Sequence, residues 1–125
     1  MIDGRLMLLE PSDEFRDSYR GLVKEFEACG EPLIPFPLGF PHADFPAFLA
    51  RLYACSRGEG LPDGFVPHST FWLVQNRTEV VGVSNLRHKL TAKLRHDGGS
   101  IGYGIRPSAR RRGLGTELLN QTLRR

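Results

Sequence analysis

The spacing of apolar residues predicts one strand followed by two helices in the first half of the chain. A short apolar run at residues 5–9 ends at Glu10-Pro11, and proline cannot continue a strand ladder. Apolar residues then recur at helical spacing between Ser12, which can cap a helix, and Gly30, which suits its end. A second helix is expected to begin near Asp44, with a proline in its first turn. Its predicted buried positions are Phe45, Phe48, Leu49, Leu52 and Tyr53.

The second half is predicted to hold three strands and a last helix. Residues 70–74 and 80–83 are apolar and β-branched and flank the short link Asn76-Arg77, so they predict an antiparallel hairpin. The basic stretch 87–97 either extends this hairpin or forms a loop. A strand follows at residues 100–106, and leucines at helical spacing from Leu114 predict a helix that runs to the end of the sequence.

The order of these elements predicts a single α/β (α+β) domain over residues 1–125. It contains an N-terminal strand-helix-helix part, central strands, and a strand-loop-helix unit at residues 99–125. Residues 31–41 join the two N-terminal helices and carry four prolines among apolar side chains. We therefore expect an irregular segment that packs against the rest of the protein.

Composition narrows the class of protein. The chain is 40% apolar and 25% charged, as ordinary globular proteins are. No apolar run is long enough to cross a bilayer and the N-terminus lacks the regions of a signal peptide, so we expect a cytoplasmic protein without a membrane partner. Cys29 and Cys55 fall within helical patterns and lack metal-ligand or redox spacing, which predicts reduced, buried thiols and no metal site.

Charge is distributed unevenly along the chain. Residues 1–84 hold 7 Lys or Arg against 12 Asp or Glu, whereas residues 85–125 hold 10 against 2. An anionic partner is therefore expected at the C-terminal third. Nucleic acid, a phosphorylated cofactor and a solvated surface would all fit this composition, so local geometry must distinguish them.

Residues 110–116 carry the clearest chemical signal in this basic region. Glycines allow the backbone to approach an anion closely, and the helix that starts here offers unpaired N–H groups and a positive dipole end. Arginines and a threonine hydroxyl add charge and a further donor. The segment reads Arg110, Arg111, Arg112, Gly113, Leu114, Gly115 and Thr116.

The glycine spacing separates this loop from two other phosphate-binding loops. A P-loop needs Gly-Lys-Ser/Thr, but Gly115 is followed by Thr116, and a dinucleotide-binding loop needs a small residue where Leu118 stands. The motif R-x-x-G-x-G, filled by Arg110, Gly113 and Gly115 after a strand, instead resembles the pyrophosphate loop of the GNAT acetyltransferases. The order of the upstream elements is also similar to that family, which implies a mixed, largely antiparallel sheet flanked by helices.

The resemblance implies that acetyl-CoA is the co-substrate and that backbone amides bind its pyrophosphate. The amides in question are those of Arg111, Arg112, Gly113, Leu114, Gly115 and Thr116. The arginine side chains, including Arg110, are expected to add phosphate contacts. It also implies that pantetheine runs beside the end of strand 100–106 like an added strand, with Ile105 as the candidate for the backbone contact.

Strand 100–106 has a distinctive alternation of its own. Ile101, Tyr103 and Ile105 share one face, whereas the other face carries glycines at 102 and 104 and ends at Arg106. Glycines in strands mark a bulge or a closely approaching backbone or ligand. Either arrangement fits a cofactor cleft.

The resemblance implies direct attack of an amine on the thioester, with no covalent enzyme intermediate. Many members of the family place a glutamate on the strand, but residues 100–106 contain no carboxylate. His88, His96, Asp97 and Tyr103 lie near enough in sequence to act as a base or acid, and spacing favours none of them. Tyr103 is expected to pack rather than to catalyse.

Two further expectations follow from the resemblance. The family's sheet continues beyond this motif with more strands and a helix that often bears an acidic tyrosine, so we expect the sequence to be truncated, with an exposed strand edge that allows a homodimer. The acceptor amine is unidentified, and residues 31–44, with Phe36, Phe40 and His42, are expected to shape its pocket.

Two other functions compete with an acetyl-CoA-dependent N-acetyltransferase. The missing carboxylate keeps a CoA-binding protein without activity as an alternative. A nucleic-acid-binding module is less favoured, because Tyr103 is the only aromatic residue after Trp72 and the basic residues are not interleaved with stacking rings.

Overall fold

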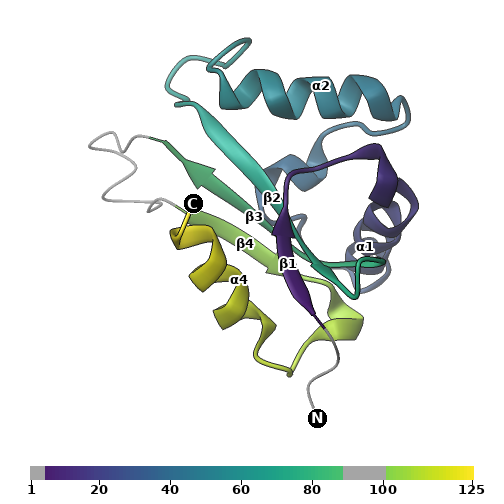
Figure 1. Ribbon diagram of the computed structural model, residues 1–125. Coiled ribbons are helices and arrows are strands. Elements are labelled where there is room, and N and C mark those ends of the chain that lie inside the picture. The colour runs from purple at the N-terminus through teal and green to yellow at the C-terminus, as the bar shows by residue number, and fades with distance from the viewer. Residues whose placement is uncertain (1–4, 89–100) are drawn as a thin grey trace.

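The protein is an antiparallel four-stranded sheet with helices on both faces (Figure 1). A computed structural model describes residues 5–88 and 101–125. Its elements follow the predicted order, and the mixed α/β fold class is confirmed. They are β1 (Leu6–Leu9), α1 (Arg16–Ala28), α2 (Phe45–Ser56), β2 (His68–Gln75), β3 (Glu79–Arg87), β4 (Ile101–Ile105) and α4 (Leu114–Leu123).

The strands lie in the order β1-β2-β3-β4, so each strand pairs with its neighbour in sequence. The predicted link between β2 and β3 is a tight turn, in which Asn76 and Arg77 have φ of 55° and 61° and the Thr78 N–H donates to the Gln75 carbonyl at 3.1 Å. Positive φ at both central residues gives the turn whose twist suits a hairpin.

The two N-terminal helices begin differently. At α2 the Asp44 side chain accepts a hydrogen bond from the Ala47 N–H at 3.1 Å, so it caps the helix as its residue type predicts. Ser12 makes no such bond, because a 3-10 turn at residues 13–15 precedes α1. Gly30, with φ of 67°, ends α1 as expected.

Helices α1 and α2 cover one face of the sheet, and the aromatic core lies between them. The Trp72 side chain is fully buried, and Tyr19 of α1 stacks on it with ring centroids 4.7 Å apart. Phe48 of α2 also stacks on Tyr19, and their ring centroids are 5.2 Å apart. The predicted apolar faces of both helices are therefore the faces that meet β2 and β3.

Helix α4 covers the opposite face (Figure 1). Leu114 and Leu118 pack there against Leu73, and the Ser84 and Thr122 hydroxyls lie 2.8 Å apart in a buried hydrogen bond. Leu118 has no exposed surface. This packing fixes the start of α4, and hence the loop before it, against β3 and β4.

The pairing of β2 with β3 contains a β-bulge beside the end of β4. Leu73 pairs with Gly82 and Val74 with Val80, so Val81 has no partner on β2. The Val81 carbonyl instead accepts the Arg106 N–H at 2.7 Å. This bond holds Arg106, the first residue after β4, where the loop begins.

The two cysteines differ in exposure. Cys55 is buried as expected, but Cys29 is exposed, because it follows the last turn of α1. Within residues 5–88 and 101–125 no helix is long and apolar enough to span a bilayer. In the same residues no three His, Cys, Asp or Glu side chains gather as metal ligands would.

Candidate cofactor-binding site

The loop between β4 and α4 presents a row of unused backbone donors. Its chain turns through a 3-10 turn at residues 107–109 and then takes positive φ at Arg111 (68°) and Gly113 (76°). Gly113 precedes the first residue of α4. No N–H group from residue 111 to residue 116 donates to another described residue. Unused donors of this kind, together with the positive end of a helix dipole, favour a negatively charged group.

A hollow of about 360 Å³ lies against these donors. It is lined by residues 103–105 of β4 and by residues 110, 111 and 113–115 of the loop and helix. Arg111 and Arg112 are exposed, and neither has a hydrogen-bonded or ion-paired partner among the described residues. The hollow therefore combines free N–H groups with one unpaired cation, Arg111, and Arg112 follows it in the chain. Free donors and cations together are the composition expected of a phosphate site.

The outer edge of β4 borders the same hollow. Because the Arg106 N–H bonds to β3, the alternation of an antiparallel ladder turns the N–H and C=O groups of Ile105 and Tyr103 away from β3. In the described residues no strand pairs with that edge. The Ile105 N–H group therefore faces the hollow without a strand partner among the described residues.

The Arg110 side chain, which was expected to contact phosphate, is already engaged within the protein. Its guanidinium forms a two-point ion pair with Glu31, at 2.8 and 2.6 Å, and its Nε donates to the Ile105 carbonyl at 3.2 Å. This ion pair lowers the pKa of Glu31 and raises that of Arg110. Arg110 thus ties the loop to the end of α1, and Arg111 and Arg112 are the arginines left for phosphate.

Arg106, at the start of the loop, is bonded to β3 and α1. The Arg106 side chain is only 6% exposed, and each nitrogen of its guanidinium donates a hydrogen bond. Nε donates to the Val80 carbonyl at 2.9 Å, Nη2 to the Ser18 carbonyl at 2.5 Å, and Nη1 to Glu25 at 2.7 Å. Glu25 also accepts the Ser108 N–H at 2.9 Å. One carboxylate of α1 thereby holds both the end of β4 and the start of the loop.

Replacing Glu25 by glutamine should destabilise the protein in a pH-dependent way. Burial alone would raise the pKa of Glu25, but hydrogen bonds from Ser108 and Arg106 and the charge of Arg106 lower it below its ordinary value of 4.5. The ion pair therefore contributes above that value and is lost as the pH falls through the lowered pKa. We expect Glu25→Gln to reduce the free energy of unfolding by about 2 kcal/mol near neutral pH.

Urea denaturation near neutral pH and in acid measures this difference. It should shrink in acid, where the wild-type carboxyl is protonated too. Glu27→Gln, an exposed neighbour on α1, is the control and should change stability little at either pH. A Glu25→Gln effect of equal size at both pH values would contradict the ion-pair explanation.

The glycine face of β4 is covered by the protein itself. A Cβ on Gly104 would collide with the Ile34 carbonyl oxygen, and one on Gly102 would lie 3.4 Å from Pro35 Cβ. The closely approaching backbone predicted for these glycines is thus the proline-rich segment 31–41, which packs as expected. The hollow lies along the outer edge and opposite face of the strand.

The predicted catalytic candidates are dispersed. His88 lies at the far end of β3, where its Nε2 is 2.7 Å from Ser69 Oγ. His96 and Asp97 lie outside the described residues. Tyr103 does not pack in the core as expected but is 41% exposed, and its ring lies beside Gly115. It is the one candidate among the described residues that lines the hollow.

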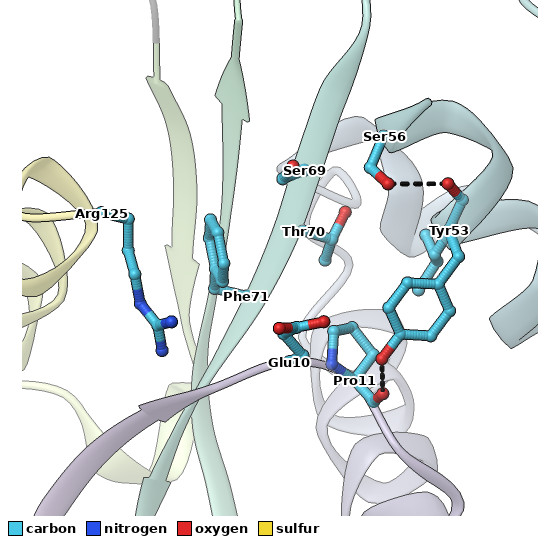
Figure 2. Close-up of a pocket in the computed structure, with 9 residues that line it drawn as sticks. Glu10, Pro11, Tyr53, Ser56, Ser69, Thr70, Phe71 and Arg125 are labelled. Atoms are coloured by element: carbon cyan, nitrogen blue, oxygen red, sulfur yellow. Dashed lines mark hydrogen bonds between the residues drawn. The ribbon is translucent and has the colours of Figure 1, made fainter. Parts of the chain in front are cut away.

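A second hollow, of about 290 Å³, lies where β1 ends, between α2, β2 and the last residue (Figure 2). Several of its polar groups already have partners. The Tyr53 hydroxyl donates to the Pro11 carbonyl at 2.6 Å, and Arg125 donates to the Leu8 carbonyl while its guanidinium lies over Phe71. It offers fewer free donors than the loop at residues 111–116.

Comparison with known proteins points to the same part of the chain. The model of the acetyltransferase (GNAT) family matches residues 27–125, which include α2, the strands β2 to β4, the loop with its free N–H groups, and α4. No curated protein matches the chain.

Proposed function

Because the chain belongs to the acetyltransferase (GNAT) family, we propose that it transfers an acetyl group from acetyl-CoA to an amine. The observation that supports this proposal most is the row of unpaired N–H groups at residues 111–116. These donors, with Arg111 and Arg112, suit the pyrophosphate of CoA. The outward N–H group of Ile105 suits a carbonyl of pantetheine, which can bind as an added strand.

The chain's own residues must then hold the reactants and move protons. Acetyl-CoA supplies the activated thioester. Tyr103 lines the hollow beside Gly115 with an exposed ring, so we propose that its hydroxyl donates a proton to the departing sulfur. β4 carries no carboxylate that could act as a base. An acceptor amine that is already neutral at the pH of the reaction needs no such base.

Calorimetric titration with CoA and an assay of thiol release test this proposal. We expect CoA to bind with an affinity that falls as salt rises, because arginines contribute to the phosphate site. Thiol release should require both acetyl-CoA and an amine. Tyr103→Phe should leave CoA affinity unchanged and lower turnover about tenfold, less than the 10²-fold or more usual for a positioned acid, because a thiolate leaves readily.

The outcomes separate the competing functions. CoA binding with no thiol released across a broad amine panel would favour a binding protein without activity. Absence of CoA binding would overturn the proposal. A salt-sensitive shift of single- or double-stranded nucleic acid, with no CoA binding, would instead favour the basic binding module.

A further inference from the structure

An aromatic hollow of about 280 Å³ lies on the face of the sheet opposite α4. Its walls come from Phe36 and Phe40, the second half of α2, residues 59–62, Phe65 and the first residue of β2. Phe36 is central: its ring centroid lies 5.8 Å from that of Phe40, 5.8 Å from that of Phe65 and 5.0 Å from that of His68. We name this group, Phe36, Phe40, Phe65 and His68, the aromatic pocket.

The aromatic pocket is open to a small apolar ligand. Phe36 is 38% exposed and Phe65 is 49% exposed, whereas rings of the core are almost fully buried. Clustered exposed rings are costly to leave in water, and they favour a flat or apolar partner. The volume is near the lower end for small-molecule sites, about 300 Å³, so the partner is a single small molecule rather than a peptide.

The charges around the aromatic pocket select the kind of molecule. Arg51 stacks over Phe40, with its Cζ 3.6 Å from the ring centroid, and it forms no ion pair with a carboxylate of the described residues. Glu59, the carboxylate that lines the pocket, is already bound to Arg57 at 3.1 and 3.2 Å. The pocket thus has a free cation and no free anion, so it suits an anionic group and disfavours a polyamine.

His68 adds a neutral donor to this wall. It is 3% exposed, and Asn85 Nδ2 lies 2.8 Å from its Nδ1. Burial and the nearby charges of Arg87 and His88 lower the pKa of His68 to about 4. The ring is therefore uncharged at neutral pH, and because Asn85 donates to Nδ1, the ring proton is on Nε2.

The aromatic pocket is joined directly to the strand that borders the proposed CoA hollow. Phe36 follows Pro35, which packs on Gly102 of β4, and Ile34 packs on Gly104. The outer edge of the same residues of β4 faces the other hollow. One short segment of backbone therefore separates the aromatic pocket from the strand along which the thioester is proposed to lie.

We infer that the aromatic pocket takes the acceptor amine and that this acceptor is an α-amino acid with an aromatic or large aliphatic side chain. The inference rests on the proposed function. The side chain packs among Phe36, Phe40 and Phe65, and the carboxylate pairs with Arg51. In the transfer the nitrogen of the uncharged amine bonds to the acetyl carbon and loses a proton, while the C–S bond breaks and the sulfur takes a proton, giving N-acetyl amino acid and CoA.

Phenylalanine and phenethylamine distinguish this acceptor from other amines, because they share a ring and an amine but differ in the carboxylate. We expect kcat/KM for phenylalanine to exceed that for phenethylamine by about tenfold, the effect of one good ion pair. Arg51→Gln should remove this preference by raising KM for phenylalanine, with phenethylamine unaffected. Arg124→Gln, in which an exposed arginine that does not line the pocket is changed, should keep the preference.

Binding of phenylalanine, followed by ligand-observed NMR, separates the pocket from the transferase. Binding that is weakened about tenfold in Arg51→Gln supports the pocket even if no thiol is released. Thiol release from amines without such binding overturns the pocket and leaves the transferase intact. Equal use of phenylalanine, phenethylamine and spermine would also overturn it. Arg51 is exposed, so thermal denaturation should show an unchanged fold in the variant.

Discussion

Replacing Gly104 by alanine is expected to lower the free energy of unfolding by about 3 kcal/mol or more, the upper range for overpacking a well-packed site. The added Cβ would overlap the Ile34 carbonyl oxygen and lie 3.2 Å from Phe26 Cζ. The obstacle is backbone, which cannot rotate away as a flexible side chain can. Either the proline-rich segment 31–41 lifts off β4 or the strand shifts, and both disturb the core beside α1.

Gly102→Ala is the matched control on the same face of the same strand. Its Cβ would meet Pro35 Cβ at 3.4 Å, which a small shift can relieve, so the loss should stay under about 1 kcal/mol. Urea unfolding followed by the fluorescence of Trp72, the only tryptophan and fully buried, measures both variants. Equal losses in the two variants would show that Ile34 does not press on Gly104.

The two glycines also show how far sequence reasoning reaches. Alternation along residues 100–106 predicts correctly that Gly102, Gly104 and Arg106 share a face, because that property is local to one strand. What covers the face is not local. Segment 31–41 has no helical or strand period, so nothing in its pattern indicates that Ile34 lies against Gly104, some seventy residues later in the chain.

In the candidate site, too, local features can be predicted from the sequence, whereas contacts between distant segments cannot. The free N–H groups at residues 111–116 follow from a glycine-containing loop before a helix, and the sequence is sufficient to predict them. The ion pair of Arg110 with Glu31 depends on how α1 packs against the loop, so the sequence alone leaves Arg110 looking free for phosphate. Its neighbours Arg111 and Arg112 could be told apart from it only with the structure.

His68 was missed among the candidate residues for a related reason. It stands singly at the start of a strand, with no neighbour at ligand or catalytic spacing. Its burial and its bond to Asn85 come from the register of β2 with β3, in which Thr70 pairs with Asn85. His68 lines the pocket because β2 pairs with β3 and because Phe36 of segment 31–41 packs beside its ring.

Replacing Gly113 by valine is expected to weaken CoA binding by about 100-fold or more. Gly113 has φ of 76°, which a β-branched residue adopts only with strain, so the loop should change its backbone path. The N–H groups at residues 111–116 then no longer converge on one anion. Losing two charge-assisted hydrogen bonds, each contributing about 1.5–3 kcal/mol, accounts for a loss of that size.

Gly64→Val is the control that separates strain from binding. Gly64 also has positive φ (85°), and, as at Gly113, nothing lies within 4 Å of an added Cβ, but it lies in the loop between α2 and β2. Thermal denaturation should show similar losses of stability in the two variants, whereas calorimetry should show weakened CoA binding in Gly113→Val alone. If both variants kept wild-type affinity, the free N–H groups of this loop would not be the donors that bind CoA. The acetyl-transfer proposal would then lose the observation on which it most depends.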